Sequence, residues 1–270
     1  MSVDIDPGAG QQLTALEETG KKRSHKLSGG TAIELFGIPV LVIVGFLLYV
    51  WWRQTASLDS IETSSLAWAD VRLQIWQHVK LTIVASLIVV AIAVPLGTLL
   101  TRPGVKLLAP IVVGIANAGQ AAPSIGLIVL LFMWLSSWSG FWVAIAALTL
   151  YGVLPVLRNT ITGLQGVDPT LVEAGRGVGL SGPAVLFRIE LPLALPVIMA
   201  GIRTSLVLVV GTAALATFVN AGGLGGVITA GITLYRYPVM VAGAVLIALL
   251  ALLVEWFGRV LELLVRPKGL

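Results

Sequence analysis

The sequence contains no cysteine and few charged residues, and these two absences narrow the class of protein. Without cysteine, the 270-residue chain can form neither a disulfide framework nor a thiolate metal site. Asp, Glu, Lys and Arg make up 11% of the residues, whereas they make up about a quarter of a typical soluble domain. Hydrophobic residues make up 57%, and the mean hydropathy is +0.98. The composition therefore predicts an integral membrane protein.

Continuous apolar runs indicate that the membrane spans are helices. A helix that crosses the ~30 Å hydrocarbon layer needs about 20 apolar residues, whereas a barrel strand needs about ten alternating ones. We predict an all-α, polytopic membrane protein with about six transmembrane helices. With SSWSG (Ser136 to Gly140) as the turn between the third and fourth, the spans fall within residues 35–52, 81–101, 107–135, 140–158, 204–235 and 237–254.

The third span is interrupted by NAGQAAPSIG, from Asn117 to Gly126. A division at Pro123 would leave two pieces that are each too short to cross a bilayer. Backbone groups freed by proline can be satisfied by neighbouring protein or by a cavity. We therefore interpret this stretch as one kinked or locally unwound helix.

Lysine and arginine are distributed unevenly over the predicted connections. With six crossings and the N-terminus inside, thirteen of the 17 basic residues face the cytoplasm. Only Arg53, Arg72, Lys80 and Arg236 lie outside. Basic residues accumulate on the cytoplasmic side of membrane proteins, so we predict a cytoplasmic N-terminus.

This topology divides the chain into four parts. They are a disordered cytoplasmic tail at 1–30, the first transmembrane helix with an external segment at 31–77, a membrane core at 78–264 with a cytoplasmic loop at 168–192, and a cytoplasmic tail at 265–270. A cleaved signal peptide is the competing interpretation of the first apolar stretch. That stretch has full span length and is followed by QTAS, a poor cleavage site, which favours an uncleaved helix.

The external segment between the first two spans carries apolar residues at near-helical spacing. They are Leu66, Leu73, Trp76 and Val79. We expect part of this segment to be an interfacial helix, with His78 at the membrane interface.

The loop at 168–192 has the signals of two short helices. Asp168-Pro169 is a helix start, with a capping carboxylate followed by proline at the first helical position. Glycines at 175, 177 and 179 would end this helix, Ser181 would cap a second, and Leu191-Pro192 would close it. Such helices suit a groove on a soluble partner; the alternative is a surface loop on lipid headgroups.

The spacing within this loop resembles the EAA motif of ABC-importer permeases, E-A-A-x3-G-x9-I-x-L-P. The matching residues are Glu173, Ala174, Gly179, Ile189, Leu191 and Pro192, and Gly175 stands where the pattern has its second alanine. Four further stretches, 78–102, 120–131, 150–164 and 198–225, are similar to the glycine betaine/carnitine/choline (osmoprotectant) permease family. The likeness covers about residues 78 to 260, so the first span lies outside it.

The resemblance implies a type I ABC-importer permease fold in a bacterial cell (inner) membrane, and a role as the transmembrane permease subunit of an ATP-driven importer for compatible solutes. It implies as partners a cytoplasmic ABC ATPase, an external substrate-binding protein and a second permease subunit, besides membrane lipid and without nucleic acid. Residues that should couple to the ATPase are Glu173, Ala174, Gly175, Gly179, Ile189, Leu191 and Pro192. The sequence contains no G-x-x-x-x-G-K-[ST] motif, so ATP and Mg would be bound by the partner, and we expect no catalytic site, metal or cofactor in this chain.

Two further features suggest less specific roles. Asn117, Gln120 and Ser124, in the broken third span, are candidates for lining a pathway because polar residues within spans tend to face the interior. Hydrogen bonding between helices is the alternative for each of them. NAGGLGG (Asn220 to Gly226) follows a helix and not a strand, so we expect a flexible external turn and not a phosphate site.

Three alternatives remain at this point. A permease for amino acids or another small polar solute has the same motif. A self-sufficient channel or ion-coupled carrier is disfavoured by the uncharged spans, since carriers often place ionisable residues in the membrane. An intramembrane enzyme would need a nucleophile–base or metal constellation, and both histidines, His25 and His78, lie outside the predicted spans.

Overall fold

The computed structural model describes residues 35–265, and every regular element in that range is a helix. The tail predicted at 1–30 and nearly all of the tail at 265–270 lie outside the described residues. Long helices are the first helix Leu35–Thr55, α3 Trp68–Leu100, α6 Gly140–Gln165, α9 Leu191–Ala213 and α11 Tyr237–Val265. Short elements are α2 Ser60–Ser65, η1 Lys106–Leu108, α4 Ala109–Ala121, α5 Ser124–Trp134, α7 Pro169–Gly177, α8 Gly182–Val185, η2 Leu186–Glu190, η3 Ala214–Val219 and α10 Gly225–Thr233.

Helix α6 is the centre of the bundle and packs between α3 and α9. In its most apolar stretch 61% of the residues are buried inside the chain, against 6% in the first helix. The three helices meet at Gly152, where an added Cβ would lie 2.7 Å from Cγ2 of Val89 and 2.8 Å from Oγ of Ser205. The Ser205 hydroxyl donates to the Gly152 carbonyl at 2.8 Å. A side chain at this position would push the helices apart.

Five helices of the described chain are long and apolar enough to span a membrane, and a bent helix pair can supply the sixth. The pair is η1–α4 with α5, bent by 100° at the break before Ser124. The third predicted span is therefore interrupted at the expected place, but by a sharp turn between two separate short helices and not within the one kinked or locally unwound helix that we expected. Tyr151 of α6 stabilises the break, because its hydroxyl donates to the Ala122 carbonyl at 2.5 Å and its carbonyl accepts from Gln120 Nε2 at 3.2 Å.

Helix α3 begins at Trp68, thirteen residues before the predicted start of the second span. The interfacial helix that we expected around residues 66–79 is thus the outer part of the same continuous helix, and the predicted boundary between 77 and 78 falls inside it. The separate short helix is α2, which begins with a capping box between Asp59 and Glu62. Helix α3 has 33 residues, whereas about 20 are enough to cross the hydrocarbon layer. Its length is therefore consistent with a helix that extends past the membrane surface.

The prediction for His78 is wrong, since its side chain is fully buried within α3. Its Nε2 lies 2.9 Å from the Val210 carbonyl, and its Nδ1 accepts from the Leu224 N–H at 3.3 Å. A ring nitrogen beside a carbonyl must carry the proton, which assigns the neutral Nε2–H tautomer. The local spacing of apolar residues around His78 gives no indication of these hydrogen bonds. Their partners lie in two segments that are more than 130 residues away in sequence.

The glycine-rich stretch 220–226 is a turn, as expected, but it is packed against α3 where we expected a flexible segment. Gly223, Leu224 and Gly225 are buried, and the Gly223 N–H donates to Gln77 Oε1 at 3.0 Å. Asn220, Gly222 and Gly223 have positive φ angles of 57°, 81° and 97°. The glycines therefore allow the chain to reverse tightly between η3 and α10 while it packs against α3.

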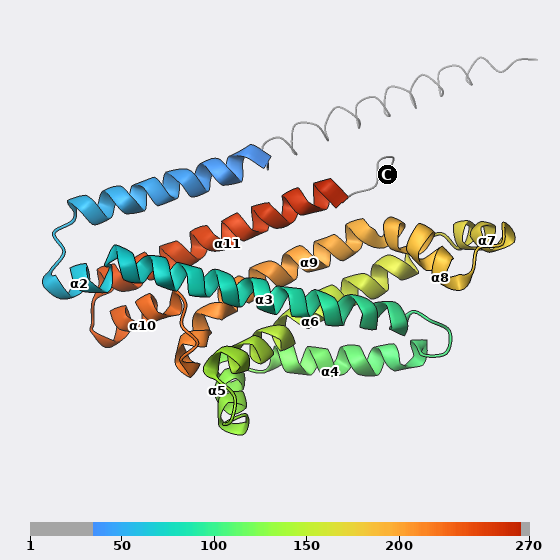
Figure 1. Cartoon of the computed structure of the whole chain (residues 1–270), viewed down its shortest axis with the longest axis horizontal. Coiled ribbons are helices and arrows are strands. Elements are labelled where there is room, and N and C mark those ends of the chain that lie inside the picture. The colour runs from blue at the N-terminus through green and yellow to red at the C-terminus, as the bar shows by residue number, and fades with distance from the viewer. Residues whose placement is uncertain (1–34, 266–270) are drawn as a thin grey trace, which may run out of the picture.

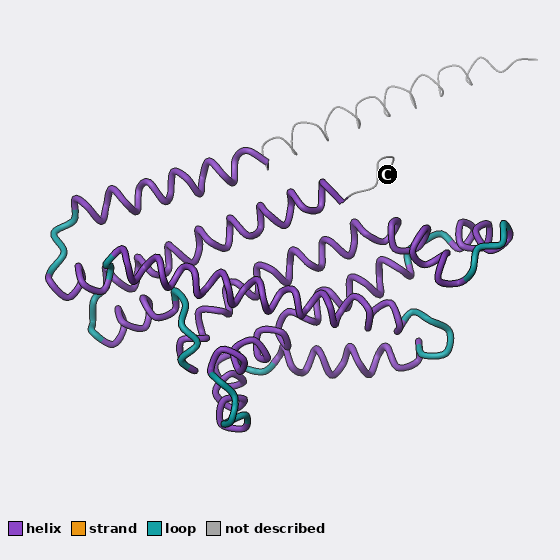
Figure 2. The backbone as a smooth tube through the Cα atoms, viewed as in Figure 1, coloured by secondary structure: helices purple, strands orange, loops and turns teal. Residues whose placement is uncertain are grey.

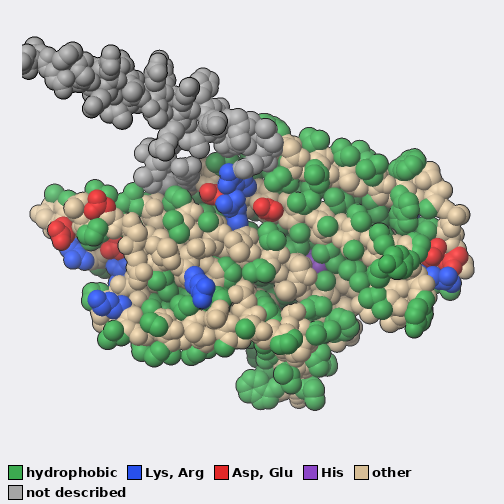
Figure 3. Space-filling view, turned by 180° about the vertical axis from the view of Figure 1, so that it is seen from behind, with side chains coloured by type: hydrophobic (Ala, Val, Ile, Leu, Met, Phe, Trp, Pro, Cys, Tyr) green, Lys and Arg blue, Asp and Glu red, His purple; other side chains and the backbone are tan. Residues whose placement is uncertain are grey.

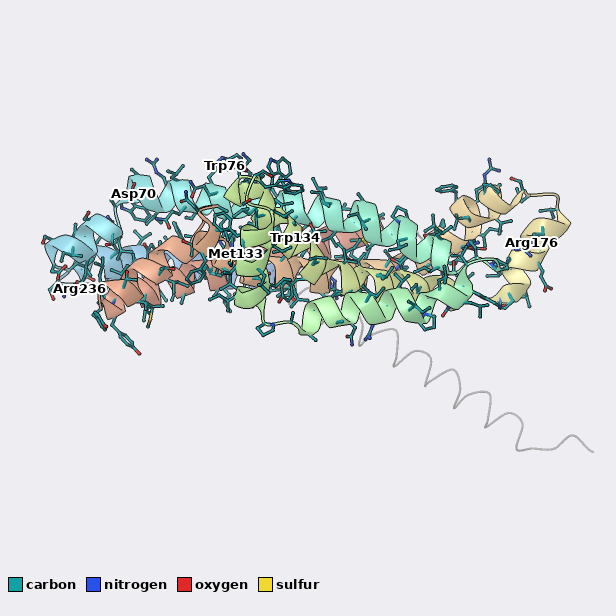
Figure 4. The ribbon with its side chains drawn as sticks, turned by 90° about the horizontal axis from the view of Figure 1, so that it is seen from below. Asp70, Trp76, Met133, Trp134, Arg176 and Arg236 are labelled. Atoms are coloured by element: carbon teal, nitrogen blue, oxygen red, sulfur yellow. The ribbon has the colours of Figure 1, made fainter. Side chains whose placement is uncertain are left out.

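The molecule is elongated, and different connections lie at its two ends (Figure 1). At one end, named here the α7 end, lie α7, α8 and the turn between α3 and η1; at the other, the α2 end, lie α2 and the turn between α10 and α11. The tube view shows that long helices occupy most of the length between them (Figure 2). Charged side chains gather at both ends and in one patch between them, and green hydrophobic side chains cover much of the remaining visible face (Figure 3). Arg176 lies at the α7 end, whereas Asp70 and Arg236 lie near the other (Figure 4).

Candidate functional site

Helix α7 opens the segment 168–192, named here the EAA segment. Pro169 is the first helical residue, and the Asp168 carboxylate accepts a hydrogen bond from the Thr170 N–H at 2.8 Å. This confirms the predicted helix start. The hydrogen bonds from Thr170 hold the pKa of Asp168 below its usual value of 3.8. The cap is therefore a carboxylate at any physiological pH.

A glycine turn ends α7 as predicted. The Leu180 N–H donates to the Gly175 carbonyl at 3.1 Å, and the Gly179 N–H donates to the Arg176 carbonyl at 2.9 Å. Together with a φ of +87° at Gly179, these two bonds define a Schellman motif. Gly179 thus sets the direction in which the chain leaves α7, and an added Cβ there would meet nothing within 4 Å.

Gly175 provides the space in which the second half of the EAA segment packs. It is buried, and a Cβ at this position would lie 2.5 Å from Cδ1 of Ile189. The side chains of Leu180 and Val185 are the next neighbours, each at 3.6 Å. The position where the motif has alanine is therefore the contact between α7 and the π-helical turn that carries Ile189.

The second half of the EAA segment does not close at Leu191-Pro192, which corrects the prediction of a separate short helix. Residues Gly182–Val219 form one apolar helical stretch of 38 residues. It contains α8, the π-helical turn η2 at Leu186–Glu190, α9, and the 3-10 turn η3 at Ala214–Val219. In the π turn the Leu191 N–H donates to the Leu186 carbonyl, five residues back. This wider turn lets the helix continue through Pro192, which has no N–H to donate.

The seven predicted coupling residues separate into two groups. Glu173, Ala174 and Gly179 are exposed on α7 and its turn. The other four, Gly175, Ile189, Leu191 and Pro192, are buried or half-buried. Leu191 packs against the cluster formed by Leu164 at the end of α6 and by Ala194 and Ile198 of α9. The motif thus combines an exposed surface with the contacts that fix this surface to the bundle.

The sequence interpretation missed Glu190, which is the best anchored charge of the EAA segment. It is 7% exposed, and Arg102 forms a bidentate ion pair with it, Nη2 to Oε2 at 2.5 Å and Nη1 to Oε1 at 3.3 Å. Arg102 lies two residues after Leu100, the last residue of α3, and follows its C-cap Thr101. One sequence signal could have indicated this ion pair. Glu190 is a carboxylate between the apolar Ile189 and Leu191, and the predicted cytoplasmic turn after the second span contains the basic residues Arg102 and Lys106.

A second ion pair links α9 to α11. Arg203 Nε lies 3.0 Å from Glu262 Oε2, and Arg259 Nη1 lies 3.8 Å from the same oxygen. Arg203 lies on α9, thirteen residues after Glu190, and Arg259 and Glu262 lie on α11, so the helical stretch that carries Glu190 and Arg203 has ionic contacts with two different neighbours.

The pathway candidates are spread around the broken span. Asn117 is exposed on α4, Gln120 donates to the Tyr151 carbonyl, and Ser124 is the first residue of α5. Gln120 therefore has the helix–helix hydrogen bond that was the alternative to a pathway role. Sequence reasoning also missed Tyr151, whose two contacts secure the break. Within residues 35–265, no group of three or more His, Cys, Asp or Glu residues could hold a metal ion.

Comparison with known proteins places these features in a wider group. Residues 93–267 match the model of a family described as "binding-protein-dependent transport system inner membrane component". The match includes α4 to α11 and the EAA segment, and leaves the first helix outside. The chain is 41% identical over 194 residues to the glycine betaine/carnitine/choline transport system permease protein OpuCB of Bacillus subtilis (strain 168), a match that covers 72% of this chain and 88% of that protein.

Two further similarities concern a relative from another bacterium and a solved structure. The osmoprotectant import permease protein OsmW of Salmonella typhimurium is 40% identical over 198 residues, covering 72% of this chain and 91% of that protein. A chain of the inward-facing MetNI methionine ABC transporter superposes with a TM-score of 0.63 and 27% identity, over 73% of this chain and 97% of that chain. The predicted type I ABC-permease fold is thereby confirmed.

Proposed function

Since the chain belongs to the family of binding-protein-dependent transport system inner membrane components, we propose that it is the permease subunit of an ATP-driven importer of compatible solutes. Glycine betaine, choline and carnitine are the solutes named for a relative with 41% identity. The relatives are transport permeases and not enzymes. ATP and Mg would be bound by a separate ABC ATPase, an external binding protein would deliver the solute, and a second permease chain would complete the pathway.

The observation that carries this proposal is the form of the α7 end. Glu173, Ala174 and Gly179 are exposed there, on a helix whose other side is fixed by Gly175 and Ile189. Two apolar side chains beside them are also exposed, Val178 at 80% and Phe187 at 68%. Exposed apolar groups next to a rigid polar motif are typical of a protein-binding surface. We propose that this surface docks on the ATPase, which requires that the α7 end and the N-terminus face the cytoplasm.

The ATPase contact is tested by copurification with the ATPase of the same transport system. Phe187→Ser should lower retention of the ATPase by roughly tenfold, as for an anchor at the centre of an interface. Phe257→Ser is the matched control, because Phe257 is equally exposed at 61% but lies on α11. Equal retention by both variants and the wild type would show that this surface is not the dock.

The solute is tested by uptake of labelled glycine betaine, choline and carnitine at high osmolarity, in cells with and without the gene. We expect gene-dependent uptake of at least one of them. An amino acid is a second candidate, because the solved relative with 27% identity transports methionine according to its description. Labelled methionine therefore belongs in the same panel. Uptake of methionine alone would replace the compatible-solute assignment and leave the permease assignment intact.

A further inference from the structure

The Arg102–Glu190 ion pair joins two parts of the α7 end that are 88 residues apart in sequence. Glu190 closes the π-helical turn, where the EAA segment becomes α9. On this turn Phe187 and Arg188 are exposed, whereas Glu190 is buried. The carboxylate is therefore directed away from the proposed docking surface and toward the bundle.

Arg102 is held on its own side by α3. Its Nε donates to the Thr98 carbonyl at 3.3 Å, and its Nη2 donates to Thr101 Oγ1 at 3.0 Å. A cation just past the C-terminus of a helix can reach back to its last carbonyls and interacts favourably with the helix dipole. The guanidinium thus has four contacts, with Thr98, Thr101 and both oxygens of Glu190, which leave it little freedom to move. A displacement of Glu190 would therefore also displace the end of α3.

The end of α3 leads directly into the broken span. Only Pro103, Gly104 and Val105 separate Arg102 from η1, which continues into α4. Helix α4 packs on α6 and ends at the 100° break held by Tyr151. The EAA segment thus contacts the bundle by two routes: along its own helix into α9, and through Glu190 and Arg102 to the α3–α4 turn.

We infer that the Arg102–Glu190 pair is a second transmission link, by which movement of the EAA segment on ATPase binding displaces the α3–α4 turn and the broken span together with α9. Glu190 and Arg102 are positioning residues, since neither needs to touch solute or ATP. This inference rests on the proposed function in one respect, because it takes ATPase binding as the cause of the movement of the EAA segment. A buried bidentate Arg–carboxylate pair suits the task because its geometry is fixed in two directions.

The chain offers a direct test because it has no cysteine of its own. Nitroxide labels can be placed at Gly104→Cys in the turn and Gly177→Cys on α7, where an added Cβ meets nothing within 4 Å at either position. The distance between the labels is measured by pulsed electron paramagnetic resonance, in the permease alone and in the complex trapped with ATP and vanadate. In the otherwise unmodified chain we expect one narrow distribution that keeps its mean on trapping, because the two parts move together.

Glu190→Leu should break the link with little loss of packing, since Arg102 is 32% exposed and can turn to water. We expect a broader distribution in the permease alone and a shift of its mean on trapping. Arg102→Gln should do the same, and the reciprocal exchange R102E/E190R should restore the narrow, unshifted distribution. Glu262→Gln is the matched control, because it removes the other ion pair of the same helix, with Arg203, and should leave both distributions unchanged.

Two results would overturn the inference. One is a label distance distribution in Glu190→Leu that is as narrow as in the labelled chain with Glu190. The other is a shift of the mean distance on trapping that is as large in the labelled chain with Glu190 as in Glu190→Leu. Failure of the ATPase to copurify with the unmodified permease is a different result, since it would contradict the proposed function. Label distances in the permease alone would then still show whether the pair fixes the turn to α7.

Discussion

Two glycine-rich segments of similar composition, residues 173–179 and 220–226, have opposite surroundings. The first ends a helix that is exposed on one side, and its Gly179 has open space around it. The second lies against α3, where Gly223 and Leu224 bond to Gln77 and His78. Glycine therefore serves two purposes in one chain: a change of direction at the α7 end and close packing of the backbone near the α2 end. Substitutions should affect the two segments very differently.

The largest effect is expected for Gly225→Ala in the packed segment. A Cβ at Gly225 would overlap the backbone carbonyl of Ala214, which no side-chain rotation can relieve. We expect a loss of stability at or above the upper end of the roughly 1–3 kcal/mol usual for overpacking, seen as a lower Tm of the purified protein. Gly211→Ala is the control, since Gly211 has nothing within 4 Å. Equal Tm values for the two variants would contradict the close contact between Gly225 and the Ala214 carbonyl.

His78→Ala should have the next largest effect. It leaves the buried Leu224 N–H without an acceptor, which costs roughly 1–3 kcal/mol, and it adds a cavity. The expected result is a lower Tm, together with faster amide exchange at residues 220–226. Leu73→Ala changes a half-exposed residue of the same helix and should leave the exchange rates as they are. A slow Leu224 amide in His78→Ala would contradict the hydrogen bond.

Gly179→Ala should act without a clash, through backbone strain alone. A left-handed φ of +87° disfavours a Cβ, so we expect a loss of about 1 kcal/mol. Since the strain lies in the turn after α7, ATPase retention should fall by more than the change in Tm suggests. The matched variant Gly177→Ala, in the same helix with a normal φ and open space, should be neutral or stabilising. Equal behaviour of the two variants would argue against a strained turn.

Gly175→Ala introduces the residue that the EAA pattern has at this position. The added methyl would meet only Cδ1 of Ile189 closely, and the end of this flexible side chain can move. We expect the gain in helix propensity, up to about 1 kcal/mol, to offset the repacking, so that Tm and ATPase retention change little. A large loss in either would show that Ile189 cannot move and that the glycine is required.

The smallest effect concerns pH and the cap of α7. Because the pKa of Asp168 is lowered by its hydrogen bonds to Thr170, the cap stabilises α7 fully above the usual value of 3.8 and loses this contribution as the pH falls through the lowered value. Amide exchange at Thr170, corrected for its intrinsic pH dependence, should thus show constant protection between pH 5 and 8. Asp168→Asn retains a capping oxygen and should behave alike, whereas Asp168→Ala should lose protection at every pH. A pH-dependent change above 5 would contradict the cap.

Local patterns predicted the start and end of α7 well, because their signals lie within a few residues of each other, whereas the helical stretches that hold the second and fifth spans begin at Trp68 and Gly182, well before the predicted ranges. Asp168-Pro169 begins α7 and Gly179 ends it as expected, and the third span is interrupted within the stretch where we predicted an irregularity. Each of these features depends on backbone geometry, and proline, glycine and a capping carboxylate determine that geometry locally.

Errors occurred where the contact comes from a distant segment. The sequence predicts an interfacial His78, whereas its ring is buried and its partners are Val210 and Leu224. The sequence predicts a helix end at Leu191-Pro192, but the π turn before Pro192 keeps the helix intact. The same holds for Glu190, whose partner Arg102 could be identified only once the α3–α4 turn had been placed beside the EAA segment.

The unbroken helical stretch from Gly182 to Val219 has a mechanical consequence. At 1.5 Å per residue its 38 residues span about 57 Å, almost twice the hydrocarbon thickness of a bilayer. Leu186 lies 19 residues, or about 28 Å, from Ser205, whose hydroxyl holds α9 to Gly152. A tilt of only about 5° around that contact would move Leu186 by roughly 2.5 Å. The helix can thus act as a lever around the Ser205–Gly152 contact, and a small rotation at one end is enough to move the other by a distance that changes side-chain contacts.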